Sequence, residues 1–294
     1  MTDAWQSDNE GPNEGRTVSP MDTRADSAST PADPSPGASP AVPVGSRAQL
    51  WWEIAIVLAL SVGKSAAYSV LALVQALTRE QALGDQTTSL NPGANAQGFW
   101  DVLYQFVGQF FAFAPIALAL YLLWEPGVSA FRRIGLDVRR FGRDAGAGVL
   151  LVLVIGVPGL ALYAAGRALG ITVQVDASPL DSSWWTIPLL LLAALRAGLT
   201  EEVIMIGYLF DRLRRLGWGT WTIILASAAL RGSYHAYQGF GPILGNAAMG
   251  VVFGWAYARW GRVMPLVIAH TLIDVVAFVG YPLAAAWWPA VFAP

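Results

Sequence analysis

The sequence predicts an all-α, polytopic membrane protein with about seven transmembrane helices and a disordered N-terminal tail. Two observations predict this fold class. First, 55% of the 294 residues are hydrophobic and only 13% are charged, and the mean hydropathy is +0.47. Second, the apolar residues form long runs separated by short polar loops. A chain of this composition cannot cover a water-exposed exterior, so lipid is its expected surroundings.

The first 47 residues are predicted to be a disordered cytoplasmic tail. They are rich in Pro, Ser, Asp and Gly and contain almost nothing large to bury, a composition typical of unfolded chains. They also lack the apolar stretch after a basic start that marks a secretory signal peptide. We therefore expect the first transmembrane helix to act as an uncleaved insertion signal, and residues 48–294 to form the transmembrane domain.

Seven later segments are apolar and long enough to cross a bilayer, whose core of about 30 Å requires roughly 20 residues of helix. The predicted spans cover residues 51–77, 99–124, 145–168, 184–210, 219–237, 242–260 and 264–289. Pro282 interrupts the last segment, and the residues beyond it are too few for another crossing.

The positions of the arginines predict the orientation, because short loops rich in Lys and Arg stay on the cytoplasmic side. Arginines follow the second, fourth and sixth predicted spans, at Arg132, Arg133, Arg139, Arg140, Arg143, Arg212, Arg214, Arg215, Arg259 and Arg262. The intervening loops carry almost none. A cytoplasmic N-terminus and an external C-terminus satisfy every loop.

Composition also argues against several classes of function. A formal net charge of −2 offers no basic face for a nucleic acid. There is no G-x-x-x-x-G-K-S/T or G-x-G-x-x-G string, so no nucleotide partner is expected. Cysteine is absent, which excludes disulfides, thiolate metal sites and cysteine nucleophiles.

The predicted spans contain a small set of ionisable residues, and at bilayer depth such residues usually mark a functional site. The set comprises Lys64, Arg196, Glu201, Glu202, Arg231, His235, His270 and Asp274, and it includes both histidines of the chain. Counting about 1.5 Å per residue from the arginine-marked ends places the acids and histidines of the fourth, fifth and seventh spans in one layer near the membrane centre. Lys64 and Arg196 have no motif around them and are expected to be structural.

The spacing of these residues favours a shared site. Arg231 and His235 are four residues apart, so they share one helix face. His270 and Asp274 have the same spacing. The adjacent acids Glu201 and Glu202 point about 100° apart on an α-helix, so both can face the interior only where neighbours lie on two sides.

Two chemistries are compatible with this set. A carboxylate in an apolar pocket near a cation can act as a general base, so Glu201 with His235 could activate a water that attacks a carbonyl. Arg231, His270 and Asp274 would then surround the developing oxyanion. Alternatively, Glu201, His235, His270 and Asp274 are candidate ligands for Zn²⁺, which would activate the water itself. The spacing does not choose between the two.

Three strings in these spans resemble the signature of a known family. They are "EEVIMIG" at 201–207, "RGSYH" at 231–235 and "HTLID" at 270–274. The CAAX protease and bacteriocin-processing (CPBP, or Abi) family of intramembrane endopeptidases carries EExxxR, FxxxH and HxxxN or HxxxD in this order, and the match covers about residues 184–280. The resemblance implies a helical membrane core that hydrolyses a peptide bond, in which Glu201 and His235 activate water while His270 and Asp274 polarise the scissile carbonyl.

Two positions depart from this signature. Ile206 stands at the Arg position of the first motif, and Arg231 stands at the Phe position of the second. We predict that Arg231 pairs with Glu202 or Glu201 and so replaces the missing cation. Asp274 lies where many members carry Asn; an ionised carboxylate cannot donate a hydrogen bond, so it could instead orient His270 or bind metal.

The function expected from the sequence is an intramembrane endopeptidase of a bacterial cell membrane. Its expected partners are the lipid bilayer and a membrane-associated peptide or protein substrate. Two alternatives stay open. A catalytically inactive scaffold or immunity-type protein is supported by the lost motif Arg at Ile206. A proton-coupled transporter is supported by Glu, His and Asp at mid-membrane, since these groups can relay protons.

Overall fold

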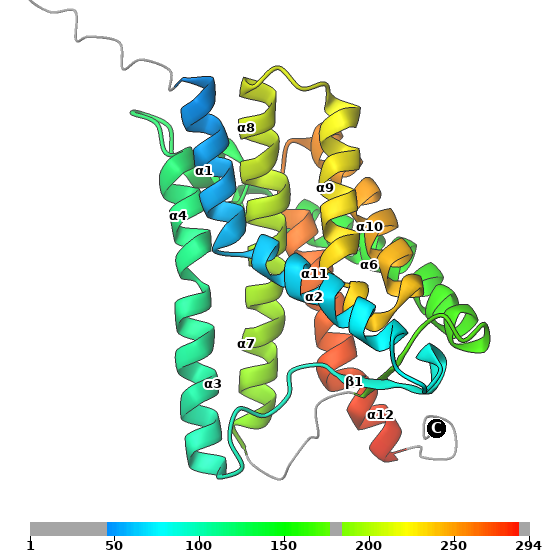
Figure 1. Ribbon diagram of the computed structural model, residues 1–294. Helices are drawn as coiled ribbons and strands as arrows, with labels where there is room; N and C mark the ends of the chain where they lie inside the picture. The colour runs from blue at the N-terminus through cyan, green and yellow to red at the C-terminus, as the bar shows by residue number, and fades with distance from the viewer. Residues whose placement is uncertain (1–45, 177–183, 288–294) are drawn as a thin grey trace, which may run out of the picture. The chain divides into compact units, whose positions relative to one another are not determined.

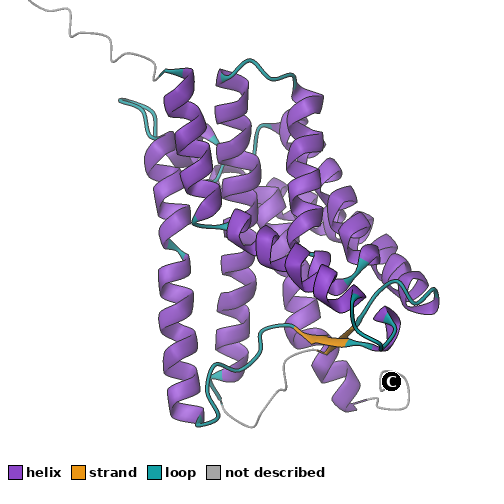
Figure 2. Cartoon of the chain, in the orientation of Figure 1, coloured by secondary structure: helices purple, strands orange, loops and turns teal. Residues whose placement is uncertain are grey.

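The computed structural model describes residues 46–176 and 184–287, and within them the fold is all-α apart from one pair of short strands (Figures 1 and 2). The α-helices are α1 (Arg47–Ala59), α2 (Val62–Leu77), α3 (Gly98–Ala112), α4 (Ala114–Leu123), α5 (Ala130–Arg133), α6 (Phe141–Ala168), α7 (Thr186–Leu199), α8 (Leu209–Arg215), α9 (Thr220–Tyr234), α10 (Phe240–Trp260), α11 (Met264–Val275) and α12 (Tyr281–Trp287). Two π-helices, η3 (Thr200–Tyr208) and η5 (Val276–Gly280), join α7 to α8 and α11 to α12. The predicted disorder of the tail, apart from its last two residues, lies outside the described residues.

Within the described ranges, three continuous helical stretches are long and apolar enough to cross a membrane: Gly98–Leu123, Val138–Ala168 and Met264–Ala284. The pair α1 and α2 would make a fourth crossing if it is one bent span. The prediction of seven spans is therefore supported only in part, although all seven predicted ranges are largely helical where described. The predicted fourth span carries too many charges to qualify, because Arg196, Glu201 and Glu202 lie within one span's length. The predicted fifth span is too short, because its helix α9 has only 15 residues.

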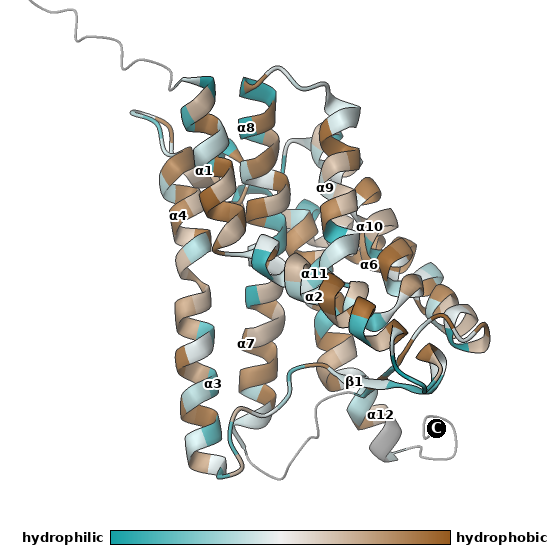
Figure 3. Cartoon of the chain, in the orientation of Figure 1, coloured by the Kyte–Doolittle hydropathy of each residue, from teal (hydrophilic) through white to brown (hydrophobic). Residues whose placement is uncertain are grey.

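Hydrophobic residues occur along the whole length of the helices (Figure 3), and many large ones are exposed. On α3 and α4, Phe99, Phe110, Phe111 and Tyr121 are each more than 60% exposed. Water-soluble monomers rarely expose large apolar patches. Together with the candidate spans, it indicates an integral membrane protein.

The predicted first span is not one helix, because α1 and α2 meet at a bend of 57°. At the break, the Ser61 hydroxyl donates to the carbonyl of Val57 at 2.6 Å, which satisfies one of the carbonyl groups freed there. A Cβ on Gly63 would lie 2.7 Å from the carbonyl oxygen of Leu58, so the bend needs a residue without a side chain. The bend lets α2 run across α9, where Ser69 accepts a hydrogen bond from the backbone of Tyr237 at 2.7 Å.

Glycines permit the close helix contacts that hold the core together. A Cβ on Gly198 of α7 would lie 2.7 Å from the Thr271 hydroxyl of α11. On α10, a Cβ on Gly250 would lie 2.8 Å from the Cα of Ala228 on α9. Contacts this short leave no room for a side chain at either glycine, so α7 packs closely on α11 and α10 packs closely on α9.

The two polar loops 78–97 and 169–185 are not wholly irregular. Strand β1 (Thr87–Ser89) pairs in parallel with β2 (Gln174–Asp176), with Thr88 opposite Val175. The side chain of Arg167, at the end of α6, donates to the carbonyl groups of Gly84 and Thr172 and so ties both loops to the helix.

The arginine-bearing loops meet one another through ion pairs. Arg133 after α4 contacts Asp211 of α8 at 2.5 Å and also Glu125, which Arg215 contacts as well. The loop after α10 is held by hydrogen bonds from the backbone of Val263 and Met264 to the carbonyls of Ile134 and Gly135. The arginines that mark the predicted cytoplasmic ends thus hold the loops of different helices together.

Acid is expected to weaken this network at Glu125. Hydrogen bonds from Arg133 and then Arg215 lower the pKa of Glu125 from its ordinary 4.5 to about 2. A depressed pKa stabilises the folded state above pH 4.5, and the contribution is lost as the pH falls from 4.5 toward 2. The midpoint of thermal unfolding, measured in neutral detergent, should therefore fall between pH 4.5 and pH 2 in the wild type. The fall should be smaller in Glu125→Gln. Equal pH profiles for the two proteins would contradict the assignment.

Candidate functional site

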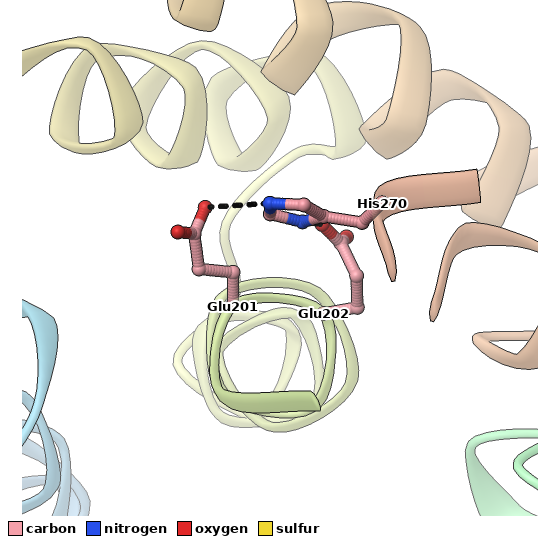
Figure 4. Close-up of side chains that lie close together, drawn as sticks. All are labelled: Glu201, Glu202 and His270. Carbon is pink, nitrogen blue, oxygen red and sulfur yellow. Dashed lines mark hydrogen bonds and ion pairs between the residues drawn. The ribbon is translucent and has the colours of Figure 1, made fainter. Parts of the chain in front are cut away.

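The two motif acids lie on η3, a nine-residue π-helical segment between α7 and α8. A π-helix bonds each residue to the one five positions away, and such segments occur frequently at functional sites. Figure 4 shows that the side chains of Glu201 and Glu202 leave this helix on the side facing His270 of α11. Both acids therefore reach one site. On an α-helix, by contrast, they would point about 100° apart and would need neighbouring helices on two sides.

Glu202 is fully buried and is held by two partners from different helices. Its Oε1 atom lies 2.5 Å from Arg231 Nη2 of α9 and 2.7 Å from His270 Nδ1 of α11. Since the acceptor is a carboxylate oxygen, Nδ1 carries the proton in this contact. Glu202 thus fastens α9 and α11 to η3.

Glu201 is the more accessible of the two acids, with 12% of its side chain exposed. Its Oε2 atom accepts a hydrogen bond of 2.6 Å from the hydroxyl of Tyr234. Arg231 Nη2 lies 3.8 Å and His270 Nε2 lies 3.9 Å from the same oxygen. These groups are close enough to stabilise the negative charge on Glu201. All three of these contacts are made to Oε2.

His270 occupies the centre of the site, because its two ring nitrogens face different acids. Nδ1 contacts Glu202, while Nε2 lies 3.9 Å from Glu201 and 3.7 Å from Asp274 Oδ2. Asp274 shares the helix face of His270, as its spacing predicted, and 17% of its side chain is exposed. It lies at the edge of the site, next to His270.

Arg231 lies where the sequence predicted, paired with the motif acids. Its short contact is with Glu202, so the predicted pairing is confirmed. The guanidinium also lies over the ring of Phe253 on α10, 5.5 Å from its centroid, an arrangement that stabilises a buried cation. Arg231 is fully buried, and its Nε and Nη1 atoms have no hydrogen-bond partner among the described residues.

His235 does not make a direct contact with either motif acid in the part of the chain that the structure describes. It ends α9, and its ring packs on Tyr234 with centroids 4.9 Å apart. Both of its ring nitrogens are buried without a hydrogen-bond partner in the described ranges. A buried polar group of this kind requires a partner such as water or a bound molecule.

Tyr234 is the site residue that sequence reasoning missed. Its hydroxyl makes the shortest contact to Glu201, and the residue is buried. The only signal available was a phenolic hydroxyl one position before a motif histidine, within an apolar span.

Two further cations in the predicted spans, Arg196 and Lys64, were expected to be structural. Arg196 donates from Nε to Gln109 on α3 at 2.6 Å, and Lys64 lies 6.0 Å from the centroid of the Tyr68 ring.

The same residues offer a possible set of metal ligands. Glu201, Glu202 and His270 each present one ligand atom, and these atoms lie within 4.8 Å of one another. This set differs from the predicted one, because it includes Glu202 and lacks His235 and Asp274. Arg231 already places a positive charge against the Glu202 oxygen, which disfavours a second cation there. The donor types fit Zn²⁺, but the charge around Glu202 is already balanced without it.

Comparison with known protein families adds an independent result. Residues 183–276 match the family described as Rce1-like, type II CAAX prenyl endopeptidase. The matched segment runs from before α7 to the end of α11 and contains all three motifs. Separate comparisons with curated proteins and with solved structures found no match.

Proposed function

We propose that this chain is an intramembrane endopeptidase whose general base is Glu201, and the match of residues 183–276 to the Rce1-like CAAX protease family supports this proposal. The substrate would be a membrane-associated peptide or protein. One observation carries the proposal: Arg231, Tyr234 and His270 converge from two helices on the paired acids of η3. A structural clasp between helices needs only one acid, whereas this arrangement keeps a second, more accessible one.

The two acids would have different roles. Glu202 is neutralised by Arg231 and His270, so it orients these two groups and takes no proton. Glu201 would accept a proton from water, and the hydroxide oxygen would bond to the scissile carbonyl carbon. The C–N bond then breaks, and the proton held by Glu201 passes to the leaving amine. Each proton and electron pair is accounted for without another reactant.

The remaining groups would act on the oxygen atoms of the reaction. Arg231 and His270 lie within 4 Å of Glu201 Oε2 and could stabilise the negative charge that develops on the carbonyl oxygen. His235 has two buried ring nitrogens with no partner among described residues, so it is suited to bind the attacking water. Asp274, whose Oδ2 lies 3.7 Å from His270 Nε2, would stabilise a positive charge on the His270 ring.

We favour metal-independent catalysis because Arg231 supplies the cation that a metal would otherwise provide at Glu202. A metal-dependent mechanism with Glu201, Glu202 and His270 as ligands is the second candidate, favoured by the closeness of their ligand atoms. Metal analysis of the purified protein separates the two. Stoichiometric zinc that is required for cleavage would overturn the metal-independent mechanism.

Cleavage by purified protein in liposomes tests the proposed function. Three peptides should be compared: a farnesylated peptide ending in a CAAX sequence, its unprenylated counterpart, and a membrane-spanning peptide. Mass spectrometry should detect a new N-terminal and C-terminal fragment from at least one of them. Absence of cleavage, together with solute flux driven by a pH gradient, would instead support a transporter. Absence of both would support the inactive scaffold.

Removing the Tyr234 hydroxyl is expected to slow the reaction without weakening substrate binding. A hydrogen bond to a charged group is worth about 1.5–3 kcal/mol, so Tyr234→Phe should lower kcat about 10- to 100-fold if the bond positions Glu201 for catalysis. KM should stay unchanged, because the hydroxyl contacts Glu201. An unchanged kcat would show that the hydrogen bond is only structural.

A further inference from the structure

A hollow of about 370 Å³ lies between the start of α6 and the junction of α10 with α11. Its lining residues come from these three elements and are Arg140, Arg143, Asp144, Ala147, Trp260, Arg262 and Pro265. Three guanidinium groups and one carboxylate therefore face it. The hollow belongs to the arginine-bearing loops and is distinct from the layer of Glu201 and His270.

Arg262 forms the fixed side of this hollow. Its Nε atom donates to both Asp144 oxygens, at 2.9 and 3.1 Å, and its Nη2 atom binds Asp144 and Asp137 at 2.6 and 3.1 Å. This bidentate pair leaves Arg262 little capacity for another anion. It also neutralises Asp144, so the charge of the hollow is set by its remaining residues.

Arg140 and Arg143 are the available cations of the hollow. Arg140 immediately precedes α6 and Arg143 lies in its first turn, and both line the hollow. Both are exposed, and neither has a carboxylate partner in the part of the chain that the structure describes. With Arg262 and Asp144 paired, the second carboxylate beside Arg262, that of Asp137, offsets one of these two cations, so one positive charge is left in excess.

The surroundings of the hollow are those of a membrane–water interface. α6 belongs to a stretch long and apolar enough to span a membrane, and the hollow lies at its first turns. Trp260 ends α10 with 38% of its surface exposed, and tryptophans concentrate where lipid headgroups begin. Basic pockets between membrane helices at this level bind anionic headgroups.

We propose that this hollow binds the phosphate headgroup of an anionic phospholipid through Arg140 and Arg143, beside the indole of Trp260. Guanidinium groups match a phosphodiester in hydrogen-bond geometry, and the one excess positive charge matches its single negative charge. The acyl chains would extend along the apolar outer face of α6, where Leu150 and Leu153 are exposed. The proposal does not depend on proteolytic activity.

Counting bound lipids on the purified full-length chain tests the proposal. The protein in neutral detergent is titrated with short-chain phosphatidylglycerol or with phosphatidylcholine of the same chain length, and native mass spectrometry counts the retained lipids. The double variant Arg140→Gln/Arg143→Gln is compared with the matched control Arg132→Gln/Arg259→Gln. The control removes the same charge from two exposed arginines that do not line the hollow.

One saturable phosphatidylglycerol is expected on the wild type and on the control. Since each Arg near an anionic surface contributes about 1 kcal/mol, the double variant should bind about 30-fold more weakly. Equal binding by the variant and the control would mean diffuse charge attraction and would overturn the proposal, as would equal retention of phosphatidylcholine. Displacement of the lipid by equimolar inorganic phosphate would indicate a site for the free anion instead. Thermal unfolding of each variant confirms that loss of binding does not come from loss of fold.

Discussion

Replacing Glu201 with Gln is expected to lower peptide cleavage about 10²- to 10⁴-fold, the contribution of a general base. Gln has nearly the shape of Glu but cannot accept a proton from water at neutral pH. Its amide oxygen can still accept the hydrogen bond from Tyr234, so the local packing is retained. The measurement is kcat/KM with the best peptide in liposomes, together with the unfolding temperature.

The partner variant Glu202→Gln provides the comparison. It changes the same chemical group one residue away, but Glu202 is fully buried and balances Arg231. Glu202→Gln should therefore lower the unfolding temperature, whereas Glu201→Gln should leave it nearly unchanged. If Glu201→Gln keeps full activity, Glu201 is not the base.

Replacing Arg231 with Met is expected to destabilise the protein by about 3–5 kcal/mol, the usual cost of removing one member of a buried ion pair. Met has a similar length and no charge, so the main change is that Glu202 stays buried without its cation. The contact with the face of Phe253 is lost as well. Denaturant unfolding in mixed micelles, followed by circular dichroism, measures the difference.

A second substitution separates the charge from the packing. In Arg231→Met/Glu202→Gln no uncompensated charge remains, so much of the lost stability should return, and a double-mutant cycle gives the coupling energy. Additive losses in this cycle would contradict a direct Arg231–Glu202 pair.

Cleavage activity tests the proposed exchange of motif cations. Arg231→Phe alone should impair cleavage, and adding Ile206→Arg should restore part of it. If Arg231→Phe is fully active and Ile206→Arg changes nothing, the exchange has no functional meaning.

Sequence patterns were sufficient to predict helical structure over each of the proposed spans. Apolar runs and arginine-rich loops predict membrane helices from composition alone, because lipid leaves few other ways to satisfy the backbone. They did not predict the 57° bend between α1 and α2, since it depends on one hydroxyl and one glycine near position 61.

The sequence by itself placed Glu201, Glu202 and both histidines in one layer, by counting residues from the helix ends. The replacement of the motif Arg also predicted the pairing of Arg231. Only the tertiary structure decided how they divide the contacts. The π-helical turn of η3 directs both acids to one side, Glu202 takes the cation, and Tyr234 rather than His235 contacts Glu201. Spacing along a helix fixes depth and face, but a contact between helices depends on their rotation and distance, which the packing of Gly198 and Gly250 sets.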